Sequence, residues 1–167
     1  YAQAKRKALR HLGLPENTAL PTNGEVDEAL RTWQSVFQGD KQAAIVDYLR
    51  RKAVELMDIL QDFRPYLTGS VLEGTAGEYS EIDIQLFADS AKEVEIFLLN
   101  QGIPYTHATP RNERAEAVLV VESDEATANL VIYPTLDERI SLKGRDGRPR
   151  PRARIGAVQA LLANDAA

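Results

Sequence analysis

The spacing of apolar residues changes near residue 64, and the change divides the chain into two parts. Before it, apolar positions recur every three or four residues, which is the spacing of amphipathic helices. After it, short continuous or alternating apolar runs are typical of β-strands. The pattern predicts an N-terminal helical segment over residues 1–62 that packs on a core domain over residues 63–167, and a fold of the mixed α+β class.

Three helices are expected in the first part, over residues 2–12, 26–38 and 41–62, with a break at Gly39-Asp40. Thr22 and Glu25 have the spacing of a capping box, which would start the second helix. Trp33, Phe37 and Tyr48 recur at helical spacing. That spacing favours packing between helices over an aromatic binding surface.

The second part combines five predicted strands with two longer helices. The strands are expected at residues 66–68, 82–87, 103–109, 117–121 and 127–133, and the helices at 90–101 and 154–163. Residues 71–77 read as a helical turn or a loop, and residues 136–140 as a short helical turn. This order predicts a mixed β-sheet with helices packed on one face, and not a doubly wound parallel sheet.

Composition narrows the range of partners. The 167 residues carry a formal net charge of -5, so duplex DNA is not an expected partner through bulk charge. No cysteine is present, which excludes disulfides and thiolate metal sites. The longest apolar run, Ala117–Val121, is too short to span a bilayer, and the basic N-terminus has no apolar core behind it. We therefore expect a cytoplasmic protein without a membrane segment.

A Gly-Ser turn and a pair of acids stand ten residues apart. Gly69-Ser70 ends an apolar strand, and Glu81-Ile82-Asp83 begins an alternating one. A period of two places both carboxylates on one face, where they repel each other unless a cation or a raised pKa intervenes. Carboxylate oxygens suit Mg²⁺ or Mn²⁺, and a glycine allows close approach of a phosphate. The plainer alternatives are an ordinary turn and a solvated strand face.

This arrangement resembles the signature of the DNA polymerase β-like nucleotidyltransferase superfamily. The segment GTAGEYSEIDIQLF is similar to the "GT…SDIDL" form of the minimal bacterial nucleotidyltransferases. The motif covers residues 60–87, and the order of elements extends the resemblance to residue 134. It implies a nucleotidyltransferase-like fold in which Gly69, Ser70 and Ser80 bind nucleotide. It further implies that Glu81 and Asp83 hold the metal and act in catalysis.

The superfamily carries a third carboxylate on a later strand, which completes the metal site and helps to deprotonate the acceptor. By position, Asn129 stands there and joins the candidate catalytic residues. An amide can ligate a metal through its carbonyl oxygen, but it cannot act as a base near neutral pH. Glu116 and Glu122, on the neighbouring strand, remain alternative third acids.

The resemblance implies Mg²⁺-dependent transfer of a nucleoside monophosphate from a nucleoside triphosphate to an acceptor hydroxyl of a small molecule, a protein or an RNA end. One alternative is a catalytically degenerate fold that acts as a nucleotide-binding or partner-binding regulatory module. Another is an interaction protein that pairs with a partner through its N-terminal helices. His11 and His107 are expected at the surface. The basic arm, residues 143–154, is expected to be a solvated loop, or else to approach a triphosphate or an acidic partner.

Overall fold

The computed structural model describes residues 7, 13, 19, 22–140 and 147–165. The chain forms two compact units, Tyr1–Lys41 and Gln42–Ala167. The helix expected over residues 2–12 and the first part of the basic arm lie outside the described residues. The expected division at residue 62 stays a prediction.

Helix α2, Asn23–Ile59, begins at the expected capping box. The Thr22 backbone N–H donates to Glu25 Oε2 over 3.1 Å, and the Glu25 N–H donates to Thr22 Oγ1 over 3.2 Å. The predicted break at Gly39-Asp40 is wrong, because the helix runs through both residues. A single glycine costs about 1 kcal/mol relative to alanine, which is too little to interrupt a helix of 37 residues.

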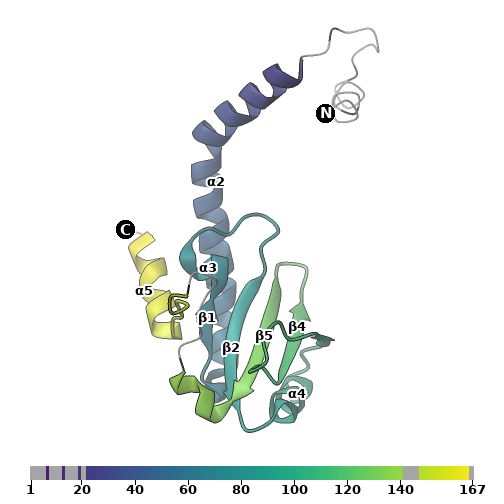
Figure 1. Cartoon of the computed structure of the whole chain (residues 1–167), viewed down its shortest axis with the longest axis vertical. Helices are drawn as coiled ribbons and strands as arrows, with labels where there is room; N and C mark the ends of the chain where they lie inside the picture. Colours follow the sequence, from purple (N-terminus) through teal and green to yellow (C-terminus); the bar gives the residue numbers. More distant parts are fainter. Residues whose placement is uncertain (1–6, 8–12, 14–18, 20–21, 141–146, 166–167) are drawn as a thin grey trace. The chain divides into compact units, whose positions relative to one another are not determined.

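The unit Gln42–Ala167 is built on a five-stranded sheet in the order β1-β2-β5-β4-β3. The central pair β2–β5 is parallel and the other pairs are antiparallel, so the predicted mixed sheet of an α+β fold is confirmed (Figure 1). The strands are β1 (Tyr66–Thr68), β2 (Ile82–Ala88), β3 (Thr106–Ala108), β4 (Ala117–Glu122) and β5 (Thr127–Pro134).

The sheet's helical side carries one continuous core. The part of α2 that follows Gln42 lies behind the sheet in Figure 1. The other helical elements are η1 (Gln61–Phe63), α3 (Gly69–Glu73), α4 (Ala91–Asn100), η2 (Thr135–Arg139) and α5 (Ile155–Asp165). Apolar side chains from α2, α3, α4 and α5 meet those of the strands in this core. Among the described residues, no helix is long and apolar enough to cross a membrane.

The core is made by alternate strand residues and by one stripe of α2. Its fully buried side chains include Met57, Leu60, Leu67, Ile82, Ile84, Leu86, Leu98, Leu119, Leu130 and Ile132. Tyr48 does not belong to it, because its side chain is 40% exposed and its hydroxyl donates to the Glu125 carbonyl over 3.3 Å. The expectation that Tyr48 is a core residue is therefore wrong.

Residues between the core positions face the other side of the sheet, which we call the second face. It carries a small cluster of Tyr66, Phe87, Ala115 and Tyr133. The Phe87 ring packs edge-on against Tyr66 and stacks on Tyr133, with centroids 5.7 Å apart in both pairs. Since strand residues alternate between faces, Asp83 and Gln85 lie on the same face as Phe87.

Candidate functional site

The turn between β1 and α3 lies directly against Asp83. The antiparallel register sets Thr68 opposite Asp83, and Gly69 follows with a φ of 78°. A Cβ atom added to Gly69 would stand 2.8 Å from Asp83 Oδ2. Both the left-handed backbone and this close approach require glycine here. The glycine therefore serves the contact between the turn and the acidic residue.

Helix α3 is held from behind by a buried arginine. Arg50, 8% exposed, donates from Nε to the Val71 carbonyl over 2.9 Å and from Nη2 to the Leu72 carbonyl over 2.8 Å. A guanidinium at the C-terminal carbonyls of a helix is favourable for hydrogen bonding and for the helix dipole. Arg50 thereby ties the Gly69-Ser70 turn to α2.

Sequence reasoning missed Arg50, although a signal was present. In α2 the buried positions Val46, Leu49, Ala53 and Met57 form one stripe, and Arg50 falls within it. A charged residue in the apolar stripe of an amphipathic helix must find hydrogen-bond acceptors once it is buried. The sequence could have shown that Arg50 needs partners, but not that these are the carbonyls of α3.

Glu81 and Asp83, which we call the acidic pair, meet the amide of Asn129. Asn129 Nδ2 donates to Glu81 Oε2 over 2.6 Å and to Asp83 Oδ1 over 3.1 Å. The parallel pairing of β2 with β5 sets Asp83 in register with Asn129, which explains the encounter. Asp83 and Asn129 are half-buried, whereas Glu81 is exposed. The structure thus brings together the three residues predicted as catalytic.

The Asn129 amide relieves the repulsion of the acidic pair, as a bound cation would. Its two N–H groups are donors, and each carboxylate accepts one of them. Among the described residues, no group of three or more carboxylate, histidine or cysteine side chains could hold a metal ion. Two carboxylates and an amide oxygen are still the ligand types that Mg²⁺ prefers. Asn129 supplies that oxygen only if its amide turns to present Oδ1.

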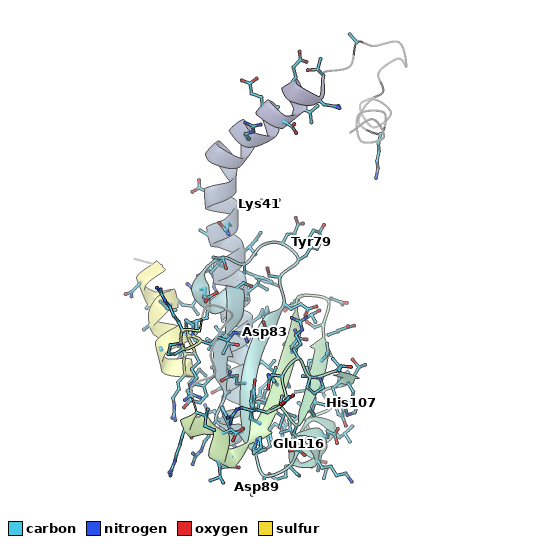
Figure 2. The ribbon with its side chains drawn as sticks, in the orientation of Figure 1. Lys41, Tyr79, Asp83, Asp89, His107 and Glu116 are labelled. Atoms are coloured by element: carbon cyan, nitrogen blue, oxygen red, sulfur yellow. The ribbon has the colours of Figure 1, made fainter. Side chains whose placement is uncertain are left out.

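Of the two alternative third acids, Glu116 lies at another part of the sheet, and Glu122 lies one strand farther from the acidic pair than Asn129 does. Glu116 Oε1 accepts the Ala91 backbone N–H over 3.2 Å, at the start of α4. Figure 2 shows Glu116 at the opposite end of the sheet from Asp83. Glu122 lies opposite Thr127, two residues along β4 from Val120, the residue that pairs with Asn129. Asn129 is therefore the residue that the sheet register brings to Asp83.

Ser80 stabilises the turn that leads into β2. Its Oγ accepts the Gly77 N–H over 2.8 Å, and its own N–H donates to the Gly77 carbonyl over 3.1 Å. Tyr79, in the same turn, is 92% exposed. Ser70 is half-buried in the first turn of α3. Gly69 lies against Asp83, Ser70 follows it, and Ser80 directly precedes Glu81. Binding of nucleotide by these three residues stays a prediction.

The end of the basic arm packs on the sheet, which the sequence did not predict. Ala153 exchanges two backbone hydrogen bonds with Leu67, of 2.8 and 3.0 Å, so the arm borders β1. The guanidinium carbons of Arg152 and Arg154 lie 4.2 and 5.1 Å from the centroid of the Tyr66 ring. Together with Arg64, these two residues form what we call the arginine cluster.

His107 lies at the surface, as expected. Its Nε2 atom is 2.5 Å from Glu95 Oε1, and the imidazole side chain is 62% exposed. The contact joins β3 to α4 on the helical side of the sheet, because His107 pairs with the core residue Leu119. His107 is therefore separated from the acidic pair by the sheet.

Comparisons with known proteins found partial structural similarity only. No protein-family model matches the chain, and no curated protein matches it. A Cid1 poly(U) polymerase structure with bound MgGTP aligns at a TM-score of 0.37 and 15% identity, over 52% of this chain and 32% of that one. A cytoplasmic RNA terminal U-transferase aligns at a TM-score of 0.35 and 21% sequence identity, over 53% of this chain and 27% of the other.

A second Cid1 poly(U) polymerase structure gives similar values, with a TM-score of 0.35 and 19% identity over 56% of this chain. The chain spans about a third of the length of these structures, between 27% and 32%. Similarity this partial carries no functional assignment. We therefore infer function from the chain's own residues.

Proposed function

We propose that the chain is a nucleotidyltransferase-like protein that transfers a nucleoside monophosphate from a nucleoside triphosphate to an acceptor hydroxyl, with Mg²⁺ as cofactor. The observation that carries this proposal is the close approach of Gly69 to Asp83, together with the contact of Asn129 with both Glu81 and Asp83, where β2 and β5 begin. Three separate stretches of sequence supply these residues. Their convergence supports a site over a solvated strand face.

Each residue has a defined task in this proposal. Glu81 and Asp83 would hold the metal, with Asn129 as a third oxygen ligand. Gly69 and Ser70 would approach the phosphates, because glycine leaves space beside the backbone and the serine hydroxyl is a donor. When bound, Mg²⁺ supplies charge neutralisation for the triphosphate and the leaving pyrophosphate. Ser80 keeps the loop before Glu81 in place.

A second candidate function rests on the Asn129 amide. Because this amide donates to both carboxylates, it reduces their repulsion without a metal. Asn129 also cannot accept the proton of an acceptor hydroxyl. A degenerate site that binds nucleotide, or a protein partner, without transfer would show both properties. We further propose that a protein partner would bind through the N-terminal helices. The proposed location of the protein is the cytoplasm.

Transfer of label tests the first proposal. The protein is incubated with each of the four triphosphates labelled at the α-phosphate, with Mg²⁺ or Mn²⁺, and with a lysate as acceptor pool. We expect incorporation by the wild type and none by Asp83→Asn, which keeps the shape of the side chain but removes its charge. A matched control is Glu95→Gln, which removes an acid on the helical side and should leave incorporation unchanged.

The outcomes separate the candidates. Incorporation that persists in Asp83→Asn would contradict a role for the acidic pair. No incorporation by the wild type, together with a Mg²⁺-dependent rise of the melting temperature in the presence of a triphosphate, would favour the degenerate site. The absence of both incorporation and a rise would exclude transfer and nucleotide binding, and would leave a partner-binding module or an interaction protein.

A further inference from the structure

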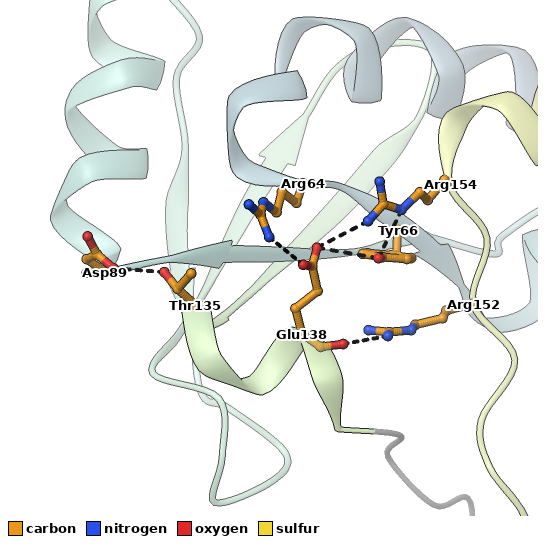
Figure 3. Close-up of polar contacts among 7 residues, drawn as sticks. All are labelled: Arg64, Tyr66, Asp89, Thr135, Glu138, Arg152 and Arg154. Carbon is orange, nitrogen blue, oxygen red and sulfur yellow. Dashed lines mark hydrogen bonds and ion pairs between the residues drawn. The ribbon is translucent and has the colours of Figure 1, made fainter.

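Three arginines gather around Glu138 on the second face, where β1 meets the end of the basic arm; two contact its carboxylate and one its backbone carbonyl (Figure 3). Arg64 Nη1 lies 2.6 Å from Glu138 Oε1, and Arg154 Nη2 lies 3.6 Å from Glu138 Oε2. Arg152 Nη2 donates to the Glu138 backbone carbonyl over 2.5 Å. Three guanidinium groups against one carboxylate leave a formal excess of two positive charges.

The carboxylate is enclosed while the arginines are accessible. The Glu138 side chain is 13% exposed, whereas the Arg64 and Arg154 side chains are 58% and 65% exposed. Each guanidinium has five N–H donors, and Glu138 with Tyr66 uses only a minority of them. Arginine presents its donors as a planar fork, which matches a phosphate as well as it matches a carboxylate.

The arginine cluster is fixed before any ligand arrives. Arg154 Nε donates to the Tyr66 hydroxyl over 3.0 Å, and Arg152 stacks on the Tyr66 ring. The backbone pairing of Ala153 with Leu67 holds the arm that carries both residues. Surface arginines normally lose side-chain entropy when they bind an anion, and this arrangement removes part of that cost.

The backbone of Arg64 is also held in place. Its φ of 52° and ψ of 62° lie in the left-handed region, and it is the single non-glycine residue with positive φ in the described part of the chain. Arg64 is the C-cap of η1, and its backbone N–H donates to the Gln61 carbonyl over 3.2 Å, so this conformation fixes the direction in which the chain leaves the helix. The same residue's side chain pairs with Glu138 Oε1.

We propose that the arginine cluster is a phosphate-binding site, in which Glu138 occupies the place of the anion until a phosphate group displaces it. The cluster lies toward the opposite end of β2 from the acidic pair, because Arg64 precedes Tyr66, which is opposite Gln85, and because Glu138 lies in η2, which follows Pro134, the partner of Ala88. The five residue steps of β2 from Asp83 to Ala88 correspond to about 17 Å. The phosphate belongs either to the nucleotide itself or to a second molecule, and binding does not require that transfer occurs.

A purely structural role for the ion pairs predicts a different response to mutation. If Glu138 only fastens the arm, then replacing it loosens the arginines and weakens any interaction with anions. If Glu138 competes with the anion, then Glu138→Gln removes the competitor and raises the local positive charge by one. The two accounts therefore predict opposite signs for one substitution.

Calorimetric titration with inorganic pyrophosphate in EDTA tests the proposal. We expect Glu138→Gln to bind pyrophosphate about threefold more tightly than the wild type, because one competing charge is gone. Arg154→Gln and Arg64→Gln should each bind about fivefold more weakly. Arg51→Gln is the matched control. Arg51 pairs with Asp47 on the exposed side of α2, so this variant should leave the affinity unchanged.

Equal affinity of the wild type and both arginine variants would overturn the proposal, as would weaker binding by a folded Glu138→Gln. Circular dichroism establishes folding, and Arg64→Gln remains informative if Glu138→Gln unfolds. The pyrophosphate titration is then repeated in the presence of Mg²⁺ and a saturating, non-hydrolysable triphosphate, to identify which molecule carries the phosphate that the cluster binds. Loss of pyrophosphate binding assigns the site to the nucleotide's own phosphates, and unchanged binding assigns it to a second molecule. Either result is independent of the transfer assay.

Discussion

Gly69 and Asp83 approach each other so closely that no side chain fits at position 69. The glycine φ is 78°, and an added Cβ would stand 2.8 Å from Asp83 Oδ2. The sequence identified this glycine through its spacing from the acids. It did not show that Asp83 itself is the group that excludes a side chain, because that contact depends on the pairing of β1 with β2.

Gly69→Ala should destabilise the protein by about 2 kcal/mol, through backbone strain and displacement of the Asp83 carboxylate. Gly102→Ala is the control, because Gly102 has a φ of 70° but no atom within 4 Å of an added Cβ. Gly102→Ala should cost about 1 kcal/mol from backbone strain alone. Urea denaturation of both variants measures the difference. Equal destabilisation would contradict the close contact.

Asn129→Asp should place three carboxylates together and destabilise the metal-free protein by about 1–2 kcal/mol, since two charge-assisted hydrogen bonds are lost and a like charge is added. Mg²⁺ should restore that stability, because three acids bind a divalent cation better than two acids and an amide. Melting temperatures with Mg²⁺ and with EDTA measure both effects.

Asn129→Ala is the control for that experiment. It loses the same donors without adding a charge, so we expect destabilisation that Mg²⁺ does not restore. If Asn129→Asp responds to Mg²⁺ no more than Asn129→Ala does, the position is not within reach of a metal held by the acidic pair.

At the scale of elements, helix α3 depends on α2 through Arg50. Five residues are too few for a helix to be stable by itself, so its position comes from its neighbours. The two carbonyls that Arg50 binds belong to the residues directly after Ser70. The position of the Gly69-Ser70 turn is therefore set in part from α2.

Arg50→Met should destabilise the protein by about 2–3 kcal/mol, because two buried carbonyls lose a charged donor. Arg51→Met, the neighbouring control on exposed α2, should cost less than about 0.5 kcal/mol. Hydrogen exchange should show earlier loss of protection in Arg50→Met at the Gly74 and Thr75 amides, which donate to the Ser70 carbonyl. Unchanged protection there would mean that Arg50 does not hold α3.

Most elements were predictable from the period of the apolar pattern, because β1, β2, β4 and β5 contribute side chains to one core. The capping residues were less predictable. The box at Thr22 and Glu25 forms, whereas Ser90 makes no side-chain cap to α4 and Glu116 binds the Ala91 amide instead. Glu116 is distant in sequence from α4, so local spacing could not reveal this bond.

At the scale of the whole unit, strand order creates the candidate site. Because β2 and β5 are parallel neighbours, their first residues share one edge of the sheet. The antiparallel β1 ends at that same edge, so Gly69 arrives beside the start of β2. The sequence supplied the candidate residues and the α+β class. The meeting of Gly69, the acidic pair and Asn129 depends on which strands are neighbours in the sheet, and so does the contact of the basic arm with Leu67. No local sequence pattern specifies those neighbours.

The Lys52–Glu125 ion pair joins α2 to the β4–β5 hairpin within this unit. The hydrogen bond to Glu125 is the main cause that raises the pKa of Lys52 above its usual 10.5. A raised pKa in the folded state means that the stabilisation is present below pH 10.5 and is lost as the pH rises through the folded value. The difference in melting temperature between the wild type and Lys52→Met should therefore be constant from neutral pH to about 9.5 and shrink at higher pH. A difference that grows with pH would contradict this contact.

The most direct test of the account is calorimetric titration of a non-hydrolysable nucleoside triphosphate into the wild type and Asp83→Asn, each with Mg²⁺ and with EDTA. We expect the wild type to bind at least about tenfold more tightly with Mg²⁺ than with EDTA, and Asp83→Asn to bind at least about tenfold more weakly than the wild type in Mg²⁺. Equal affinity of the two proteins, or a wild-type affinity that is the same in Mg²⁺ and EDTA, would contradict a metal-dependent nucleotide site at the acidic pair.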